Sequence, residues 1–404
     1  MSARAAALAA GATTLGLVAV ACALAWRDDS PLVPRDGGLA DQGTSWTFLG
    51  LLVAAFGAYP VGLLFMQRTT VPLRAVVGLA AAVQLVPLAA PLLLSTDAWT
   101  YWGYGWIGAE GGGNPYDDPP AAFPDSPAAG HVGAAWRDTT SVYGPLFTLV
   151  SELVARVAGT SPDAAAWLFK GLAALGMLAA VAAVSRSART PALAAAFVGW
   201  NPVIAVHAAG GGHNDALVGA LVAWAVAFAV HRREALSGAT WALAVFVKWV
   251  PILFFALAAT AARAGRRPTG IAAAALTALA ASIVATWFYG AGWLGALGPL
   301  TDNAERETDY ALPARLEQLG LPHGVSLGLA VVVFVVGLGW LARDAIRGRA
   351  RFGWAACLVL ATTPYLVVWY LAWAVPLAAV DDDRGARLAA LAFTAYLLPQ
   401  TIPL

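Results

Sequence analysis

The stretch STDAWTYWGYGW (residues 95–106) directly follows an apolar segment, residues 75–94, that is long enough to cross a bilayer. Asp97 is therefore expected where a helix leaves the hydrocarbon, among aromatic side chains that favour the membrane interface and also stack on sugar rings. A charge at that depth loses solvation, which favours a functional site. The alternative is an aromatic belt at the interface with one solvated aspartate.

The composition is that of a membrane protein with several spans. Hydrophobic residues make up 60% of the 404-residue chain and charged residues only 12%, whereas a water-soluble domain carries roughly 25% charged residues. The formal net charge of +1 leaves no basic surface for phosphates, which argues against a nucleic-acid partner. Cys22 and Cys357 both fall in apolar runs, which supports neither a disulfide framework nor a thiolate metal site.

Apolar runs divide the chain into predicted membrane helices. The first, residues 5–26, is longer than the usual apolar core of a signal peptide, and we interpret it as a retained helix rather than a cleaved leader. Residues 75–94 form another predicted span. Further spans are predicted at residues 46–66, 164–184, 192–209, 216–230, 270–289, 324–341 and 388–399.

Two apolar segments, residues 238–262 and 352–380, are flanked by arginines at both ends. Arginine-rich connections are typically cytoplasmic, so both ends of each segment are expected on the same side of the membrane. One straight span cannot return to its starting side, but two half-helices can, and Pro251 ends a helical hydrogen-bonding ladder near Lys248. We therefore predict two membrane hairpins, the second with its apex at residues 363–370.

Three segments are predicted to lie outside the hydrocarbon. Residues 95–140 form a long acidic loop rich in proline and glycine, and loops of this length are usually functional. In residues 141–159, polar side chains spaced four apart from Thr148 to Arg156 share one helical face, which predicts an amphipathic helix in the membrane interface. Residues 290–322 form a second outer loop.

Together these segments predict an all-α polytopic membrane protein. It is expected to be one domain, residues 1–404, of about 11–13 transmembrane or half-membrane helices. The arginine pattern places the N-terminus in the cytoplasm and the C-terminus outside. The positions of the acidic residues are independent of the arginine rule, and most of them fall toward the outer face of the same topology.

Unusual polar residues converge on the predicted outer face, at the Asp97 segment, at residues 213–215 and at the apexes of the two hairpins. An ammonium near the membrane midplane costs about 2.5–3.5 kcal/mol, so Lys248 is expected to have an anionic partner or to face water. A lipid phosphate at the edge of the leaflet would supply that partner. The alternative is an internal ion pair with a helix carboxylate.

The order and spacing of several short motifs carry a family resemblance from Asp97 to Trp373. The motifs are Asp97 after a span, Asn114-Pro115-Tyr116, Tyr143-Gly144-Pro145, Asn201-Pro202, Gly212-His213-Asn214-Asp215, Lys248 before Pro251, and Trp369-Tyr370-Leu371-Ala372-Trp373. The chain thus resembles the actinobacterial polyprenol-phosphate-mannose-dependent α-1,6-mannosyltransferases of lipomannan and lipoarabinomannan assembly, which belong to the GT-C membrane glycosyltransferases. The resemblance implies a GT-C-like bundle and a lipid-phosphate sugar donor. It also implies a glycolipid or mannan acceptor on the outer face.

The resemblance further implies that the first outer loop supplies a catalytic carboxylate, here Asp97. Glycosyl transfer needs a base for the proton of the acceptor hydroxyl, and positive charge stabilises the departing phosphate. We predict Asp97 as the base of an inverting single displacement, with Lys248 and Arg306 at the donor phosphate. Residues predicted to contact the sugar or the acceptor are Trp99, Tyr101, Glu110, Asn114, Tyr116, Tyr143, His213, Asn214, Asp215, Trp369 and Tyr370.

No cofactor is predicted. His207, His213 and Asp215 carry metal-ligand atoms, but the gap between the histidines crosses a predicted helix end, and a monophosphate leaving group has less need of a metal. The expected location is the bacterial plasma membrane, with the active site on the extracytoplasmic face. The expected partners are a polyprenyl-phosphate-mannose donor, a glycolipid or mannan acceptor, and membrane lipids.

A transporter or a flippase for lipid-linked sugars is the alternative from another class of protein. Broken helices and intramembrane charges also serve alternating access. The sequence shows no convincing internal repeat, however, and its polar residues gather toward one face rather than at the midplane. The pattern therefore favours the enzyme.

Overall fold

The computed structural model describes residues 2–34, 41–296, 306–381 and 383–404. Within these ranges the chain forms helices and connections and contains no β-strand, which confirms the predicted all-α class. Five of the described helices are long and apolar enough to cross a membrane. They are α1 with its following turn (Ala3–Trp26), α2 (Gln42–Met66), α6 (Pro162–Ser187), α12 (Ile271–Tyr289) and α15 (His323–Ile346).

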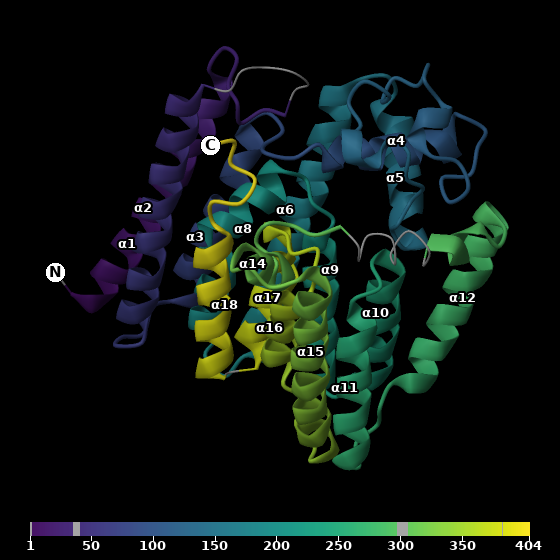
Figure 1. The fold of residues 1–404 in the computed structure, drawn as a ribbon. Helices are drawn as coiled ribbons and strands as arrows, with labels where there is room; N and C mark the ends of the chain where they lie inside the picture. Colours follow the sequence, from purple (N-terminus) through teal and green to yellow (C-terminus); the bar gives the residue numbers. More distant parts are fainter. Residues whose placement is uncertain (1, 35–40, 297–305, 382) are drawn as a thin grey trace.

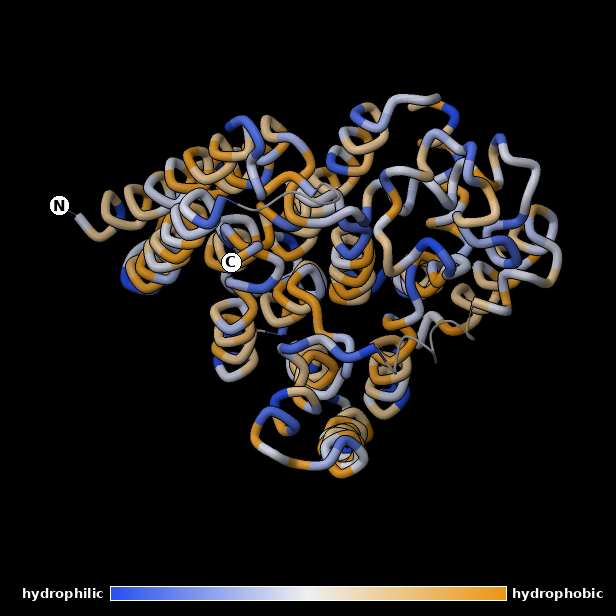
Figure 2. Tube along the Cα trace, turned by 45° about the horizontal axis from the view of Figure 1, so that its top comes forward, coloured by the Kyte–Doolittle hydropathy of each residue, from blue (hydrophilic) through white to orange (hydrophobic). Residues whose placement is uncertain are grey.

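The helices pack around α6, the most buried of these spans. α1 and α2 pair at one side of the molecule, and α4 (Asp97–Ala109) and α5 (Pro145–Ala158) pair at its opposite upper side (Figure 1). α9 (Asp215–Val230) lies against α6 in the centre. Hydrophobic residues run along the helices and hydrophilic residues concentrate in the connections, as expected for a membrane bundle (Figure 2).

One predicted span, residues 192–209, is broken in the structure. α7 (Pro191–Gly199) is followed by α8 (Pro202–Ala205) and a π-helical turn (Val206–Gly210), and the two halves are bent by 51°. The Asn201 side chain accepts hydrogen bonds from the N–H groups of Val203 and Ile204 and so caps the second half. Pro202 lacks the N–H that would continue the ladder from α7.

The predicted span at residues 75–94 is wrong in its length. α3 (Leu73–Leu85) and a short 3₁₀ turn (Val86–Ala89) end early, and the chain then runs irregularly to Asp97. The buried ammonium of Lys170 donates to the carbonyls of Ala90 and Pro91, so a side chain from α6 satisfies the backbone there. The apolar composition of residues 75–94 did not show that the helical segment ends at Ala89.

The prediction that Asp97 lies in a loop is also wrong, because Asp97 begins α4. Gly105 and Gly108 allow close packing of α4 on α5, since a Cβ at either position would meet Ser151 or Glu152. The aromatic side chains that suggested an interface belt therefore lie mostly in a packed protein interior. The remainder of the predicted loop, up to residue 140, is largely irregular.

The amphipathic helix predicted within residues 141–159 is present as α5, but Thr148 and Glu152 of its polar face are buried, and only Arg156 at its end is exposed. Glu152 is buried and accepts a hydrogen bond of 2.6 Å from the Tyr289 hydroxyl, whereas Leu153 and Val157 are exposed. Outward apolar side chains are expected where a helix faces lipid. Its location in the membrane interface stays a prediction.

Each segment predicted as a hairpin folds as two helices that meet at an apex, while its placement in the membrane stays a prediction. α10 (Glu234–Val247) and α11 (Pro251–Ala264) meet at Lys248, and α16 (Phe352–Thr362) and α17 (Leu371–Val380) meet at residues 363–370. In the second hairpin the N–H of Gly353 donates to Asp381, so both open ends lie together. In the first, Gly238 contacts Gly270, six residues beyond the end of α11.

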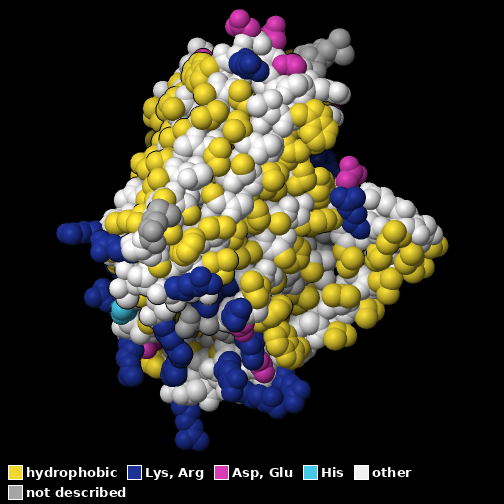
Figure 3. All heavy atoms as spheres, turned by 90° about the vertical axis from the view of Figure 1, so that its left-hand side faces the viewer, with side chains coloured by type: hydrophobic (Ala, Val, Ile, Leu, Met, Phe, Trp, Pro, Cys, Tyr) yellow, Lys and Arg dark blue, Asp and Glu magenta, His cyan; other side chains and the backbone are white. Residues whose placement is uncertain are grey.

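The remaining helices close the described fold. α14 (Leu312–Gln318) lies in the predicted outer loop 290–322, of which residues 297–305 are outside the described part, and α18 (Arg384–Leu397) lies near the C-terminus. Figure 3 shows most of the lysines and arginines of one face gathered at its lower end, acids at both ends, and an apolar band between them. The gathering of basic side chains at one end is the pattern that the positive-inside rule describes.

Candidate functional site

A cavity of about 250 Å³ opens where the apexes of the two hairpins meet the first turn of α4. Its walls are mostly apolar and aromatic, which suits an amphipathic ligand. Two charged side chains, Asp97 and Lys248, reach it from different elements. The complete lining is Asp97, Tyr101, Trp136, Val142, Tyr143, Lys248, Trp249, Val250, Val359, Thr363, Pro364, Tyr365, Trp369, Tyr370 and Trp373.

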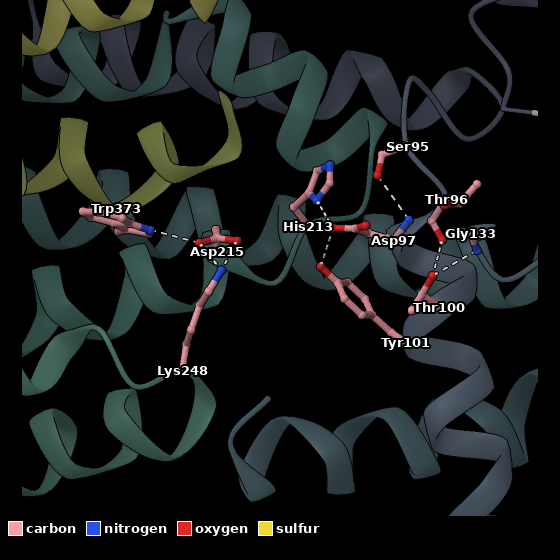
Figure 4. Close-up of polar contacts among 10 residues, drawn as sticks. All are labelled: Ser95, Thr96, Asp97, Thr100, Tyr101, Gly133, His213, Asp215, Lys248 and Trp373. Carbon is pink, nitrogen blue, oxygen red and sulfur yellow. Dashed lines mark hydrogen bonds and ion pairs between the residues drawn. The ribbon is translucent and has the colours of Figure 1, made fainter. Parts of the chain in front are cut away.

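The Asp97 carboxylate is held between two hydrogen-bond donors. Its Oδ2 lies 3.1 Å from His213 Nδ1 and 3.3 Å from the Tyr101 hydroxyl (Figure 4). A carboxylate only accepts, so His213 Nδ1 donates to it. The imidazole is itself stacked on Trp369, with 3.9 Å between ring centroids. Asp97 is thus fixed in orientation while its side chain stays 12% exposed.

The ionisation of Asp97 follows from these contacts. Burial raises the pKa of the carboxyl, but the contact with His213, the charge of Lys248 and the Tyr101 hydrogen bond together offset burial and hold the pKa below its ordinary value. Asp97 is therefore ionised at neutral pH and able to accept a proton.

Lys248 is paired inside the protein. Its Nζ lies 2.9 and 2.8 Å from the two carboxylate oxygens of Asp215, which is fully buried at the start of α9. Trp373 Nε1 donates to the same carboxylate at 2.9 Å (Figure 4). Of the two partners considered for Lys248, a lipid phosphate and a helix carboxylate, the structure therefore shows the carboxylate. Lys248 remains 20% exposed toward the cavity, and an ammonium has a third N–H to offer there.

Arg306 lies at the rim of the cavity rather than in its lining. Its guanidinium sits 4.9 Å from the ring centroid of Trp136. It donates to the carbonyl of Ala135 at 2.9 Å and to the Thr139 hydroxyl at 3.0 Å. A guanidinium carries five N–H donors, so these contacts leave others for a ligand.

The structure separates the predicted site residues into two groups. Tyr101, Tyr143, Trp369 and Tyr370 line the cavity with Asp97 and Lys248, and His213 and Asp215 support those two charges from behind. The others lie elsewhere: Trp99 beside a second cavity, Glu110 exposed at the end of α4, Asn114 bonded to Asp117, Tyr116 bonded to Tyr143 and Thr148, and Asn214 buried outside the lining. The roles assigned to all of them stay predictions.

Several cavity residues were not predicted. Trp249 lines the cavity with a buried indole N–H that has no hydrogen-bond partner among the described residues. Its position beside Lys248 at a hairpin apex could have identified Trp249 as a site residue from the sequence. Trp136 comes from the irregular segment after α4, where no local pattern marks it. Within the described part of the chain, His207, His213 and Asp215 do not form a group whose ligand atoms lie close enough together to hold one metal ion.

The fold and the cavity define a polytopic membrane protein with a carboxylate and an ammonium in an aromatic pocket. The family model described as Alpha-(1->6)-mannopyranosyltransferase, N-terminal domain, matches residues 3–265. The chain therefore belongs to this α-(1→6)-mannopyranosyltransferase family.

Individual relatives agree with the family match. The chain is 27% identical to an Alpha-(1->6)-mannopyranosyltransferase of Mycobacterium tuberculosis, over 76% of this chain and 66% of the relative. It is 28% identical to Alpha-(1->6)-mannopyranosyltransferase A of Corynebacterium glutamicum, over 57% of this chain and 52% of the relative. A comparison with solved structures gave no match. The chain thus spans between half and two thirds of the length of these two relatives.

Proposed function

We propose that the chain is a membrane mannosyltransferase that moves mannose from a polyprenyl-phosphate donor to a glycolipid or mannan acceptor. The single observation that carries this proposal is the cavity that unites the Asp97 carboxylate with the Lys248 ammonium among aromatic side chains. Membership of a mannopyranosyltransferase family supports the choice of sugar.

The proposed reaction is an inverting single displacement. The acceptor hydroxyl gives its proton to Asp97 as its oxygen bonds to the anomeric carbon of the donor mannose. The bond from that carbon to the phosphate oxygen breaks, and its electron pair leaves with the polyprenyl phosphate. In this proposal Lys248, which is partly exposed to the cavity, and Arg306, which stacks on Trp136 of its wall, stabilise the charge of this leaving group. No step requires a metal or another cofactor.

An apolar groove supports a lipid donor. Val359 and Thr363 line both the cavity and a groove between α15 and α16, whose other lining residues are Ala330, Val331, Phe334 and Thr362. The groove is almost entirely apolar, and α15 is one of the candidate membrane spans. A prenyl chain in this groove would reach the bilayer while its phosphate stays at Lys248.

We further propose that the cavity faces the extracytoplasmic side. The hairpin apexes lie opposite the arginine-rich ends of the same hairpins, and those ends are expected in the cytoplasm. The N-terminus then lies inside and the C-terminus outside. The protein resides in the bacterial plasma membrane in this proposal.

The direct test is transfer by purified protein in detergent micelles, where no gradient exists. We expect mannose to pass from synthetic polyprenyl-phosphate mannose to an octyl α-mannoside, with an α-linked product from a β-linked donor, read by NMR. The transporter alternative predicts no product in micelles and gradient-dependent movement in vesicles.

The length of the donor chain gives a second, sharper test. Val359→Trp narrows the passage between cavity and groove, so activity with a long-chain donor should fall while activity with a short-chain donor is kept. Val335→Trp, at an exposed position of α15 outside the groove lining, is the matched control. Equal loss with both donors would contradict the groove assignment.

A further inference from the structure

A second group of titratable side chains lies away from the cavity lining, where the loop after α12 leads into α15. Glu307 follows Arg306, Glu317 belongs to α14, and His323 is the first residue of α15. His323 Nδ1 lies 2.7 Å from Glu317 Oε1 and 3.5 Å from Glu307 Oε1. All three candidate ligand atoms lie within 4.8 Å of one another. Three separate segments therefore bring metal-ligating atoms to one point.

One carboxylate oxygen of Glu307 has the His323 imidazole nearby, at 3.5 Å, but no hydrogen bond from the described residues. This oxygen, Oε1, is buried. Two carboxylates that face one another are costly unless positive charge lies between them, and among the described residues only the exposed His323 imidazole stands at that place.

We propose that Glu307, Glu317 and His323 bind one divalent transition-metal ion, with Zn²⁺ the best match. Imidazole nitrogen combined with carboxylate oxygen suits zinc better than magnesium or calcium, which prefer oxygen alone. In tetrahedral sites these ligand atoms lie about 2.0–2.2 Å from the ion and hence roughly 3.4 Å from one another. The 3.5 Å separation of His323 Nδ1 and Glu307 Oε1 matches this spacing, whereas the 2.7 Å separation of His323 Nδ1 and Glu317 Oε1 would lengthen as the ion replaces the hydrogen bond between them.

The fourth ligand position would be open to water. The His323 side chain is 60% exposed, so one side of the group faces solvent. Zinc sites with three protein ligands commonly complete their tetrahedron in this way. Because the group lies outside the lining of the cavity, the ion would hold the loop and not take part in sugar transfer.

The ion would brace the wall of the cavity. Thr308, next to Glu307, exchanges hydrogen bonds with the backbone of Leu366, and its N–H donates to the carbonyl of Pro364. Pro364 and Tyr365 line the cavity. A metal that joins Glu307 to the first turn of α15 therefore fixes this loop against the second hairpin.

The test is calorimetric titration of Zn²⁺ into full-length protein purified with a histidine-free tag and stripped with EDTA. We expect one ion per chain and a Tm that rises with Zn²⁺ concentration, because a ligand specific for the folded state stabilises it. His323→Gln and Glu317→Gln should each weaken binding by about 100-fold or more, since even second-sphere partners change metal affinity by about 10–100-fold.

His231→Gln is the matched control, because His231 is exposed and bonds only to the carbonyl of Arg186 among the contacts described. This variant should bind Zn²⁺ as the unmodified protein does. The site is refuted if no saturable binding occurs up to millimolar Zn²⁺, or if His323→Gln and Glu317→Gln bind as tightly as the control. Neither readout depends on mannosyl transfer, so the outcome is separate from the test of the proposed function.

Discussion

Two aspartates near the cavity have opposite environments. Asp215 is fully buried and paired with the Lys248 ammonium and the Trp373 indole. Asp97 is slightly exposed, contacts His213 and Tyr101, and faces the cavity. The first carboxylate is satisfied by protein, whereas the second retains acceptor capacity toward a ligand. The difference indicates that Asp215 positions Lys248 and that Asp97 is available for chemistry.

Asp97→Asn should give the largest effect on activity. The variant keeps size and polarity but removes the proton acceptor, so we expect kcat to fall about 10²–10⁴-fold, the usual contribution of a general base. The Tm should change little. Asp125→Asn, an exposed aspartate of the same segment, is the control and should keep full activity. Equal turnover by the two variants would remove Asp97 from the base role.

Asp215→Asn should differ from Asp97→Asn in having a large effect on stability. It leaves Lys248 without its counter-charge, and breaking a buried pair costs about 3–5 kcal/mol. The lower end of that range applies because Lys248 is 20% exposed. Thermal unfolding in detergent measures the loss. Adding Lys248→Met should restore part of the Tm, and a Tm for Asp215→Asn equal to that of Asp125→Asn would contradict the pairing.

His213→Phe tests whether His213 acts by orienting Asp97. Phenylalanine keeps an aromatic ring against Trp369 but cannot donate to Asp97. Hydrogen bonds to charged groups contribute about 1.5–3 kcal/mol, so we expect kcat to fall about 10- to 100-fold. His213→Asn, whose amide can donate, should recover part of the activity, and the KM for the donor should not change in either variant.

The same variant should also shift the pH dependence. The contact with His213 lowers the pKa of Asp97 against the effect of burial. Removing it raises that pKa, so the acidic limb of the kcat profile should move to higher pH. An unchanged acidic limb would show that His213 does not set the ionisation of the reacting base.

Tyr101→Phe should have the smallest effect. The hydroxyl lies 3.3 Å from Asp97 Oδ2, which is a long contact between the carboxylate and a neutral donor. Net contributions of ordinary hydrogen bonds are about 0.5–1.5 kcal/mol, so activity should fall about 2- to 10-fold. A loss as large as that of Asp97→Asn would mean that the tyrosine takes part in proton transfer.

Sequence patterns predicted the elements that depend on local chemistry and on membrane sidedness. Arginines at both ends, with Pro251 in the middle, were enough to predict the α10–α11 hairpin and its apex at Lys248. The convergence of Asp97 with the Lys248 apex was also predicted from the sequence, and both side chains line the cavity. These features need no knowledge of distant contacts.

The predictions that were wrong, and the contacts that were not predicted, depend on packing between segments that are distant in sequence. α4 is helical and buried because Gly105 and Gly108 admit α5, which periodicity does not show. The early end of α3 is satisfied by Lys170 from α6. The partner of Lys248 lies 33 residues away on α9, and no spacing rule connects them.

The most direct test of the shared cavity is a cryo-EM map of the protein with bound polyprenyl phosphate. The account predicts phosphate density within hydrogen-bond distance of Lys248 Nζ, on the cavity side that faces Asp97, with the chain leaving between α15 and α16. Phosphate density remote from both Asp97 and Lys248 would contradict it.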